Sequence, residues 1–381
     1  MHVPPGAAAS TLLPALERVL DGRDPALLAL PGADDRESAA LRAGLRVGES
    51  IDEDVAVVVA TSGTTGVPKG ALLTAAALAA SAAATHDRLG GPGSWLLALP
   101  PHHIAGLQVL VRSALAGAVP VEMDVSAGFD ATELPSAIRR LGSGRRYTSL
   151  VAAQLAKALG DPAAAAALAE LDAVLLGGGP APRPVLDAAA AAGITVVRTY
   201  GMSETAGGCV YDGVPLDGVR LRTVDGRIVI GGATLAKGYR NPVDPDPFAE
   251  PGWFRTDDLG AVSAAGVLTV LGRADDAIST GGLTVLPQPV EAALCAHPAV
   301  SDCAVFGVAD DRLGQRVVAA IVVQDGSAAP SLDDLRAQVT RTLDATAAPR
   351  ELHVVAALPR RGIGKVDRAA LVRRFAAPSD Q

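Results

Sequence analysis

A segment rich in glycine and hydroxyl side chains follows an apolar run near the N-terminus. Residues 55–60 read Val-Ala-Val-Val-Val-Ala and predict a buried strand, and residues 61–70 read Thr-Ser-Gly-Thr-Thr-Gly-Val-Pro-Lys-Gly. Glycine lets the backbone approach a ligand closely. Successive backbone N–H groups with Ser and Thr hydroxyls form a concave nest for phosphate oxygens, and Lys69 adds a positive charge. The segment therefore predicts a phosphate-binding loop directly behind a strand.

The spacing of this segment differs from that of a P-loop. A P-loop has four residues between its first glycine and a Gly-Lys-Ser/Thr ending. Here only two residues separate Gly63 from Gly66, and a glycine follows Lys69. The alternative is an ordinary polar turn between a strand and a helix.

Composition limits the classes of protein to which the chain can belong. Its 381 residues suggest two or three structural units, and with 49% apolar and 19% charged residues a large core is expected and wholesale disorder is excluded. The net charge of −8 argues against a general attraction to nucleic acid or anionic membranes. A phosphate ligand must therefore be held by a local site.

Cysteine usage and hydropathy indicate a reduced, soluble, cytoplasmic protein. The three cysteines, Cys209, Cys295 and Cys303, form no CxxC pair. The N-terminus lacks the basic region of a signal peptide, and no apolar run approaches the ~18 residues that span a bilayer. The sequence leaves the oligomeric state open, including a homodimer.

Apolar runs alternate with alanine-rich stretches through the first half of the chain. We expect strands at residues 55–60, 95–99, 173–176 and 194–198, and helices near residues 71–89, 104–116, 131–141 and 183–192. This alternation predicts an α/β fold of layered, mainly parallel sheets and helices.

The pattern of predicted strands and helices changes twice in the second half of the chain. From about residue 208, short strands at 219–224, 227–230 and 267–271 predict a small antiparallel sheet or barrel. Beyond residues 272–276, a small α+β unit is expected, with helices at 289–296 and 331–343 and strands at 302–308, 317–324 and 352–355. We therefore predict a large domain over residues 1–273 and a small mobile domain over residues 274–381, with a hinge near 272–276.

Further polar clusters follow other predicted strands. Ligands of open α/β sheets sit at strand ends, and residues 199–205 place Tyr200 and Glu204 just after the strand at 194–198. Tyr200 offers an aromatic surface for a base, and Glu204 offers an oxygen ligand for Mg²⁺. Alone, the Ser-Glu-Thr turn would be a helix cap. The glycines 177–179 suit a planar ring, or else form only a flexible turn before Pro180.

Two more clusters lie near the proposed boundary and the C-terminus. Residues 252–260 set Asp257 and Asp258 in a predicted turn, where a carboxylate could hold the vicinal hydroxyls of ribose. Residues 362–368 read Gly-Ile-Gly-Lys-Val-Asp-Arg and put Lys365 on a glycine-flanked loop. The alternative for residues 252–260 is a solvated turn, and the alternative for residues 362–368 is a surface loop.

Together these segments resemble the acyl-adenylating superfamily, which includes acyl-CoA synthetases, adenylation domains of peptide synthetases and luciferases. The resemblance covers roughly residues 51–370, with the motifs in the family order. It implies an ATP site, with Mg²⁺ on Glu204, a hinge at Asp275 and a catalytic pair of Lys365 and Glu204. The implied ATP-binding residues are Thr61, Ser62, Gly63, Thr64, Thr65, Gly66, Lys69, Gly177, Gly178, Gly179, Tyr200, Ser203, Asp258 and Arg273.

Residues 200–218 and 232–241 resemble more closely the o-succinylbenzoate–CoA ligases of menaquinone biosynthesis, in their short actinobacterial form. That family implies adenylation of the succinyl carboxylate, with pyrophosphate release, followed by thioester formation with CoA. His103 would border the acyl channel, Arg112 would face the ring carboxylate, and Gly201 would line the pocket. The alternatives are a CoA ligase for another aryl or fatty acid and a non-catalytic nucleotide-binding scaffold.

Departures from the family pattern accompany this resemblance. The ribose motif reads Thr256-Asp257-Asp258 in place of Thr-Gly-Asp, which leaves the ribose ligand open between Asp257 and Asp258. Residues 279–282 read Ser-Thr-Gly-Gly, where many relatives carry a lysine two residues before the glycine. The N-terminal region is shorter than in most relatives, so we expect a trimmed first subdomain.

Overall fold

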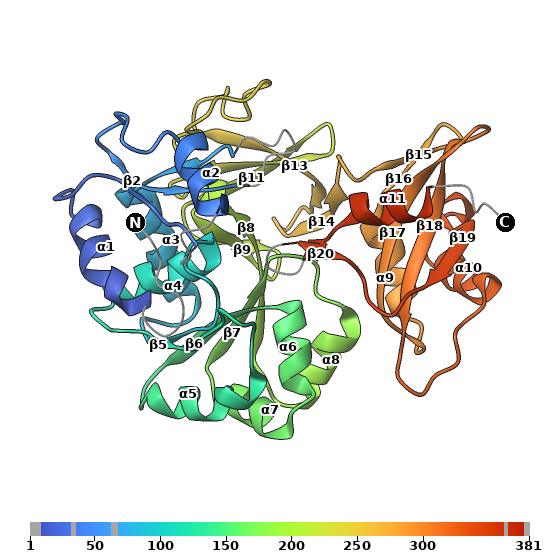
Figure 1. Ribbon diagram of the computed structural model, residues 1–381, viewed down its shortest axis with the longest axis horizontal. Coiled ribbons are helices and arrows are strands. Elements are labelled where there is room, and N and C mark those ends of the chain that lie inside the picture. The colour runs from blue at the N-terminus through green and yellow to red at the C-terminus, as the bar shows by residue number, and fades with distance from the viewer. Residues whose placement is uncertain (1–8, 32–35, 62–67, 362–364, 377–381) are drawn as a thin grey trace.

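The computed structural model describes residues 9–31, 36–61, 68–361 and 365–376. It has the mixed α/β architecture that the sequence predicts, with several layered sheets and a small C-terminal α+β part. Figure 1 shows the large part carrying β2 to β13 on one side and the smaller part carrying β15 to β19 on the other. Among the described residues, no helix is long and apolar enough to cross a membrane.

The central element of the large part is a seven-stranded sheet in the order β10-β9-β8-β7-β6-β4-β5. Strands β5, β4, β6, β7 and β8 run parallel, and β9 and β10 are antiparallel additions at one edge. The strands are β4 (Ser94–Leu97), β5 (Val121–Glu122), β6 (Arg146–Val151), β7 (Ala173–Gly177), β8 (Val196–Met202), β9 (Gly207–Tyr211) and β10 (Val214–Pro215). The predicted parallel sheet is therefore confirmed.

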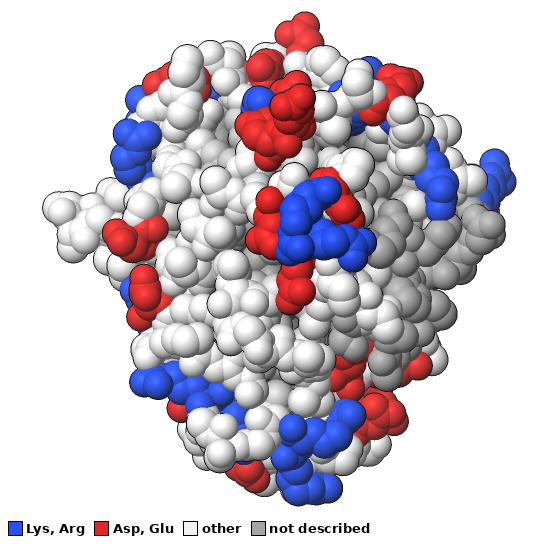
Figure 2. Space-filling view, turned by 90° about the vertical axis from the view of Figure 1, so that its left-hand side faces the viewer, with Lys and Arg blue, Asp and Glu red and all other residues white. Residues whose placement is uncertain are grey.

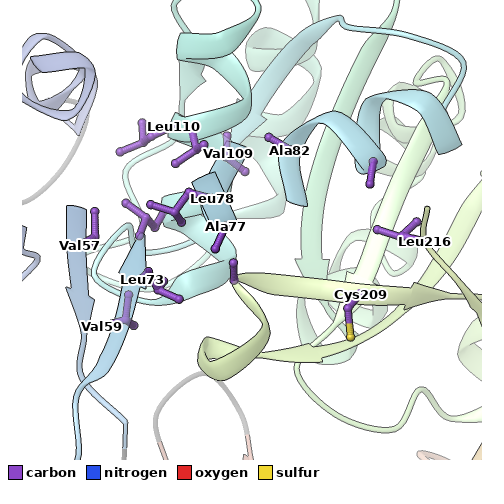
Figure 3. Close-up of a cluster of buried hydrophobic side chains, with 14 of the residues drawn as sticks. Val57, Val59, Leu73, Ala77, Leu78, Ala82, Val109, Leu110, Cys209 and Leu216 are labelled. Atoms are coloured by element: carbon purple, nitrogen blue, oxygen red, sulfur yellow. The ribbon is translucent and has the colours of Figure 1, made fainter. Parts of the chain in front are cut away.

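Helices cover both faces of this sheet, as a parallel sheet requires. Successive residues of β4 alternate between two hydrophobic clusters: Trp95 and Leu97 pack on one side, and Leu96 packs on the other. The first side is covered by α3 (Ala75–Arg88) and α4 (Ile104–Leu115), and the second by α5 (Leu134–Arg140), α6 (Ala152–Leu159), α7 (Pro162–Ala169) and α8 (Arg183–Ala191). Figure 3 shows Leu78 and Leu110, from α3 and α4, pointing into the first cluster.

A smaller sheet, in the order β1-β2-β3, carries the predicted phosphate loop. Strand β2 (Val55–Val59) is fully buried and pairs with β1 (Leu27–Leu28) and β3 (Ala71–Thr74). The predicted helix over 71–89 is therefore wrong in its first residues, because Ala71–Thr74 pairs antiparallel with β2 and Thr74 caps α3 by accepting from Ala77 N at 3.0 Å. The loop at 61–70 joins two strands, and its residues 62–67 lie outside the described part of the chain.

The third sheet of the large part is antiparallel, as predicted. It consists of β11 (Val219–Val224), β12 (Arg227–Gly232), β13 (Trp253–Val262) and β14 (Leu268–Arg273). The expected turn at residues 252–260 is wrong, because Asp257 and Asp258 lie inside the long strand β13. The pairing of β13 with β12 is irregular across these residues, between Arg255 and Leu259, and its pairing with β14 shifts between Leu259 and Gly260.

The small part is an α+β unit. Its five-stranded sheet contains β15 (Ile278–Thr280), β16 (Leu283–Val285), β17 (Val300–Asp310), β18 (Gly314–Val323) and β19 (Glu351–Val354), with helices α9 (Pro287–Cys295), α10 (Leu332–Thr340) and α11 (Arg368–Phe375). A hairpin of β20 (Arg360–Arg361) and β21 (Lys365–Val366) points back toward the large part (Figure 1). Of the buried clusters formed by described residues, none combines side chains from before residue 273 with side chains from after residue 277. This separation supports the boundary at 272–276, which stays a prediction.

The N-terminal helices α1 (Leu13–Leu20) and α2 (Arg36–Gly44) flank the small β1–β3 sheet. Figure 2 shows a face of the molecule on which Lys and Arg alternate with Asp and Glu in small groups separated by uncharged surface. This face therefore offers no broad basic patch for a polyanion.

Arg240 fastens the segment after α2 to the phosphate-loop sheet. Its guanidinium donates to the carbonyl oxygens of Leu45, Arg46, Glu49 and Ser50 at 3.3, 3.2, 3.3 and 2.7 Å. The next residue, Asn241, donates from Nδ2 to Gly44 O and Pro68 O at 2.6 and 2.7 Å. Residues 240–241 thus hold two segments that are distant in sequence at the base of the phosphate loop.

Replacing Arg240 by Ala should lower the free energy of unfolding by about 2 kcal/mol, because four carbonyl groups, of which that of Leu45 is half-buried, lose a shared charged donor. Arg183→Ala is the matched control: Arg183 makes one exposed ion pair with Asp187 at 2.7 Å, and its loss should change stability by less than ~0.5 kcal/mol. Urea denaturation measures both. Equal losses in the two variants would contradict the clamp assigned to Arg240.

Candidate functional site

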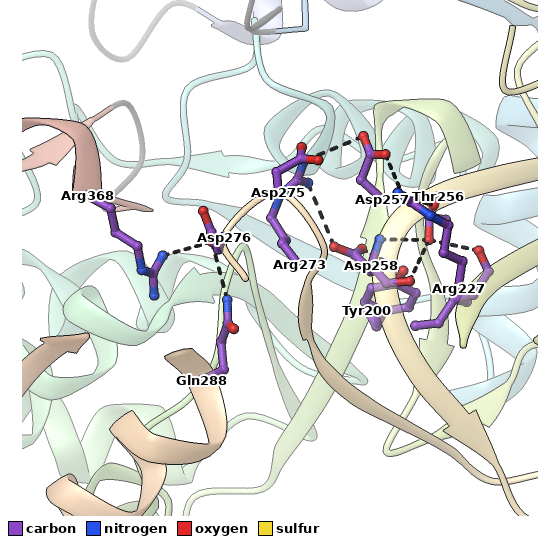
Figure 4. A network of polar contacts seen from close by, with 11 residues as sticks. Tyr200, Arg227, Thr256, Asp257, Asp258, Arg273, Asp275, Asp276, Gln288 and Arg368 are labelled. Atoms are coloured by element: carbon purple, nitrogen blue, oxygen red, sulfur yellow. Dashed lines mark hydrogen bonds and ion pairs between the residues drawn. The ribbon is translucent and has the colours of Figure 1, made fainter. Parts of the chain in front are cut away.

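Tyr200 and Asp258 meet between the central sheet and the antiparallel sheet. The strand expected at 194–198 extends to Met202, because its end pairs antiparallel with β9, so Tyr200 lies within β8 and not after it. The Tyr200 hydroxyl donates to Asp258 Oδ2 at 2.7 Å (Figure 4). Burial, reinforced by the Asp258 charge, raises the pKa of Tyr200 well above its usual value. Tyr200 therefore stays a neutral hydrogen-bond donor with an aromatic ring.

The two neighbouring aspartates lie in an irregular part of β13 and differ in their partners and exposure. Asp258 is largely buried, with 15% of its side chain exposed, and faces Tyr200. Asp257 is half exposed and pairs with Arg227 Nη1 at 2.9 Å. Thr256 supports the strand at this point, since its hydroxyl donates to Ile228 O at 2.8 Å and accepts from Asp258 N at 3.1 Å. Of the two carboxylates, Asp258 is thus the one that shares a pocket with the Tyr200 ring.

The expected glycine contacts lie at the ends of β7 and β8. A Cβ atom at Gly177 would stand 2.4 Å from Thr199 Oγ1, and one at Gly201 would stand 2.1 Å from Gly207 O. Gly178 has a φ of +82°, which favours glycine, whereas no atom lies within 4 Å of a Cβ at Gly179. The glycines thus let the ends of neighbouring strands approach each other, and Gly179 leaves open space beside them.

Glu204 lies on a short 3-10 turn, Ser203–Thr205, directly after β8. Ala206 ends the turn in the left-handed region with a φ of 49°. The Ala206 carbonyl accepts from Gln108 Nε2 at 2.7 Å and from Ser81 Oγ at 2.9 Å. Helices α3 and α4 therefore hold this turn, and with it Glu204, which is 9% exposed.

Tyr239 is a site residue that the sequence reasoning did not single out. Its hydroxyl donates to Glu204 Oε1 at 2.6 Å, and the Lys69 ammonium lies 5.4 Å from the centre of its ring. The available signal was the aromatic hydroxyl in residues 232–241, a stretch that carries the family resemblance. Lys69 and Glu204, predicted from separate motifs, are thus brought together by a third residue.

The remaining phosphate-loop residues are only partly described. Thr61 is half-buried, and its hydroxyl has no hydrogen-bond partner among the described residues. Ser62, Gly63, Thr64, Thr65 and Gly66 lie outside the described part of the chain, so their expected contacts with phosphate stay predictions.

His103 lies immediately before α4, beside His102, with the two ring centres 4.3 Å apart. Burial lowers the pKa of His103 to about 4, and the charges of His102 and Lys365 act in the same direction while Glu37 opposes them. Lys365 is exposed in β21, and its influence on His103 means that the hairpin of the small part faces this region. The structure thus relates the two residues expected at the acyl channel and on the C-terminal loop.

Arg112 is buried on α4 against Trp95. Helix α4 returns along β4, and the Arg112 guanidinium lies 4.8 Å from the centre of the Trp95 ring, near the beginning of that strand. Nine residues of helix separate it from His103, a distance of about 13 Å. Arg112 is 3% exposed, and burial lowers its pKa. The alternative of an exposed helix arginine is therefore wrong, and the expected contact of Arg112 with the ring carboxylate of an acyl ligand stays a prediction.

Charged residues at 273–276 connect the large and small parts (Figure 4). Arg273 lies 2.8 Å from Asp275 and 3.7 Å from Asp258. Asp276 turns the other way, to Arg368 of α11 at 3.0 Å, and Arg368 also binds Glu291 of α9 at 2.6 Å. Adjacent carboxylates thus pair with opposite sides of the proposed hinge.

The carboxylates near the site suit a cation that binds together with the phosphates of a nucleotide. Among the described residues, no group of three or more His, Cys, Asp or Glu side chains converges as a preformed metal cage would require. Glu204 supplies a single buried carboxylate next to Lys69, and Mg²⁺ commonly uses one or two carboxylates together with substrate phosphates. The arrangement can therefore hold a nucleotide whose phosphates bring their own Mg²⁺.

Models of known protein families match most of the chain. The family described as "AMP-binding enzyme" matches residues 18–240, and the "AMP-binding enzyme C-terminal domain" matches residues 289–365.

Curated relatives extend this likeness along the whole chain. A probable 2-succinylbenzoate–CoA ligase of Mycobacterium tuberculosis is 79% identical over 384 residues, which cover 100% of this chain and 99% of the relative. A 2-succinylbenzoate–CoA ligase of Geobacillus kaustophilus is 35% identical over 84% of this chain and 69% of its own length.

Solved structures show the same likeness in three dimensions. The o-succinylbenzoate CoA synthetase of Bacillus subtilis in complex with its acyl-adenylate intermediate is similar with a TM-score of 0.73 and 28% identity, over 94% of this chain and 80% of that one. The complex of the B. subtilis enzyme with ATP and a magnesium ion has a TM-score of 0.71 and 30% identity, over 85% of this chain and 73% of that one.

The lowered pKa of His103 predicts a defined pH dependence of stability. In the unfolded chain His103 takes up a proton near pH 6.5, whereas the folded state resists protonation until about pH 4. The contribution of His103 to the free energy of unfolding is therefore fully present above pH 6.5. It falls toward pH 4 by up to about 1.4 kcal/mol for each pH unit. His103→Asn should remove this contribution.

The measurement is the free energy of unfolding of wild type and His103→Asn between pH 7.5 and pH 5. The difference, wild type minus variant, should decrease as the pH falls. Parallel curves for wild type and His103→Asn would contradict the burial of a neutral His103.

Proposed function

The chain belongs to the family of AMP-binding enzymes, and we propose that it is a 2-succinylbenzoate–CoA ligase that acts in menaquinone biosynthesis. The observation that carries the proposal is the extent of the likeness. The 79% identical relative aligns with 100% of this chain, so every site residue from Thr61 to Lys365 lies within the alignment. Its substrates, ATP and CoA, are available in the cytoplasm, which is the compartment we propose for it.

The proposed reaction has two half-reactions. In the first, an oxygen of the succinyl carboxylate attacks the α-phosphorus of ATP, and the bond to the pyrophosphate leaving group breaks. In the second, the CoA sulfur attacks the acyl carbon, and AMP leaves. The products are the acyl-CoA thioester, AMP and pyrophosphate.

In this proposal the nucleotide lies along the residues that join the two sheets. The adenine would lie between the Tyr200 ring and the open space at Gly179. Asp258 would accept hydrogen bonds from the ribose hydroxyls. The hydrogen bond between the Tyr200 hydroxyl and Asp258 Oδ2, 2.7 Å long, fixes one carboxylate oxygen and leaves the other available. Arg273 Nη1 lies 3.7 Å from Asp258 Oδ1 and adds positive charge beside the nucleotide.

The phosphates would then extend from Asp258 toward Glu204 and Lys69. Mg²⁺ held by Glu204 would neutralise phosphate charge and so favour attack by an anionic carboxylate. Lys69 and the hydroxyls of residues 61–65 would bind the leaving pyrophosphate. Lys365, from the small part, would stabilise charge on the α-phosphate and the attacking oxygen.

His103 would border the acyl group as a neutral ring. Because burial lowers its pKa to about 4, it carries no charge at neutral pH and does not attract the carboxylate electrostatically. Its ring can instead donate one hydrogen bond and accept another. Arg112 stays the proposed partner of the ring carboxylate of the substrate, and its buried Nε has no hydrogen-bond partner among the described residues.

The test of the proposed function is the acid dependence of AMP formation. Wild type should convert ATP to AMP and pyrophosphate with 2-succinylbenzoate and CoA. The matched control acid is 4-oxo-4-phenylbutanoate, which lacks only the ring carboxylate; its kcat/KM should be lower by about 10² because the polar group that binds that carboxylate loses its partner. A preference for 4-oxo-4-phenylbutanoate or for a fatty acid would instead support a different acyl-CoA ligase.

A prediction for Lys365 separates the half-reactions. Lys365→Ala should lower the rate of adenylation by about 10²–10³, since a fixed charge near a developing anion contributes that much. Thioester formation from preformed acyl-AMP should fall less than tenfold, because we propose that the small domain then presents another face to the site. Lys157→Ala, which alters a lysine on α6 that binds Phe129 O, should leave both rates unchanged. Equal losses in both half-reactions would contradict domain alternation.

A further inference from the structure

Tyr239 stands between two predicted ligands of the nucleotide phosphates. Its hydroxyl donates to Glu204 Oε1 at 2.6 Å, while the Lys69 Nζ lies 5.4 Å from its ring centre. The second distance is within the ~6 Å over which an ammonium is attracted to an aromatic ring. One side chain therefore contacts both the carboxylate expected to bind a cation and the lysine expected to bind phosphate.

The backbone around Tyr239 holds the ring in this position. Four backbone hydrogen bonds join residues 237–241 to residues 69–72. Leu72 N donates to Gly238 O at 3.0 Å, and Lys237 N donates to Leu72 O at 2.9 Å. Arg240 N donates to Gly70 O at 2.7 Å, and Asn241 N donates to Lys69 O at 3.0 Å. Phe248 packs edge-on against the Tyr239 ring, with centres 5.5 Å apart. The side chain is thus fixed to the strand that follows the phosphate loop.

Glu204 depends on this contact because it has few others. The Glu204 residue is 9% exposed. Within the described part of the chain, neither an arginine nor a lysine pairs with its carboxylate, and the Tyr239 hydroxyl is its hydrogen-bond donor. Its carbonyl oxygen accepts from Ala236 N at 2.8 Å, which ties the backbone of the turn to the segment that carries Tyr239. The Tyr239 hydroxyl therefore sets the direction of a buried carboxylate that has one oxygen left for a cation.

We propose that Tyr239 is a positioning residue that aims the Glu204 carboxylate at a divalent cation and keeps Lys69 beside it, so that both meet the same triphosphate. This inference rests on the proposed nucleotide site and assigns a role to a residue outside the predicted set. The hydroxyl acts on the cation through Glu204, and the ring acts on the phosphates through Lys69.

Separate substitutions test the two parts of the side chain. Tyr239→Phe removes the hydroxyl and keeps the ring, so it should weaken Mn²⁺ binding in the presence of a non-hydrolysable ATP analogue by about tenfold, with little change in nucleotide affinity without metal. Tyr239→Leu removes the ring as well and should additionally weaken metal-free nucleotide binding. Electron paramagnetic resonance of free Mn²⁺ gives the metal affinity, and calorimetry gives the nucleotide affinity.

Tyr211→Phe is the matched control. Tyr211 is fully buried, and its hydroxyl lies 3.0 Å from Thr85 Oγ1, away from the phosphate loop. This variant also loses one buried hydroxyl contact, but its Mn²⁺ affinity should equal that of wild type. In assays of turnover, Tyr239→Phe should raise the Mg²⁺ concentration at half-maximal rate about tenfold, with kcat at saturating Mg²⁺ reduced less than threefold.

A double variant gives an independent reading. Glu204→Gln removes the ligand charge, so adding Tyr239→Phe to it should change Mn²⁺ affinity less than twofold. Equal Mn²⁺ affinities in wild type and Tyr239→Phe, or equal effects of Tyr239→Phe with and without Glu204→Gln, would overturn the proposal. Because metal and nucleotide binding need no acyl substrate, these outcomes are distinct from a failure of 2-succinylbenzoate to be activated.

Discussion

The carbonyl oxygen of Ala206 is the point on which the site depends. It accepts hydrogen bonds from Gln108 of α4 and Ser81 of α3, both buried helices that cover the central sheet. These bonds hold Ala206 in the left-handed region, an uncommon conformation for a residue other than glycine. The strain is local, but it turns the chain from β8 into β9 and leaves Glu204 at the bend. The packing of α3 and α4 on the central sheet thereby determines where the Glu204 carboxylate lies.

The order of structural elements could be predicted because it depends on local patterns. Apolar runs such as residues 55–60 and glycine or proline boundaries are sufficient for parallel strands and covering helices. One error came where polar residues lie within a strand. Asp257 and Asp258 suggested a turn, yet they lie in β13, where Asp257 pairs with Arg227 and Asp258 accepts from Tyr200.

Site residues far apart in the chain could be predicted only where a motif carried them. Glu204, Lys69 and Asp258 belong to such motifs, and the structure brings Glu204 and Lys69 to one tyrosine. The burial of Arg112 could not be predicted, because its distance from His103 in sequence does not indicate that its guanidinium lies on Trp95. Tyr239 was missed because its role comes from pairing between residues 69–72 and 237–241, a long-range contact that no local pattern encodes.

The charges at residues 273–276 pair with both parts of the chain, as the proposed hinge requires. Asp275 pairs with Arg273 next to Asp258, and Asp276 pairs with Arg368 in the small part. All of these ion pairs are partly exposed, so each contributes little to stability and can be exchanged at little cost. The Lys365 hairpin is attached to α11 through Asp367, whose side chain caps Ala370 N at 3.0 Å. Arg368, the first residue of that helix, therefore couples the direction of the hairpin to the hinge carboxylate. A rotation at 275–276 would move Lys365 without disturbing either hydrophobic core.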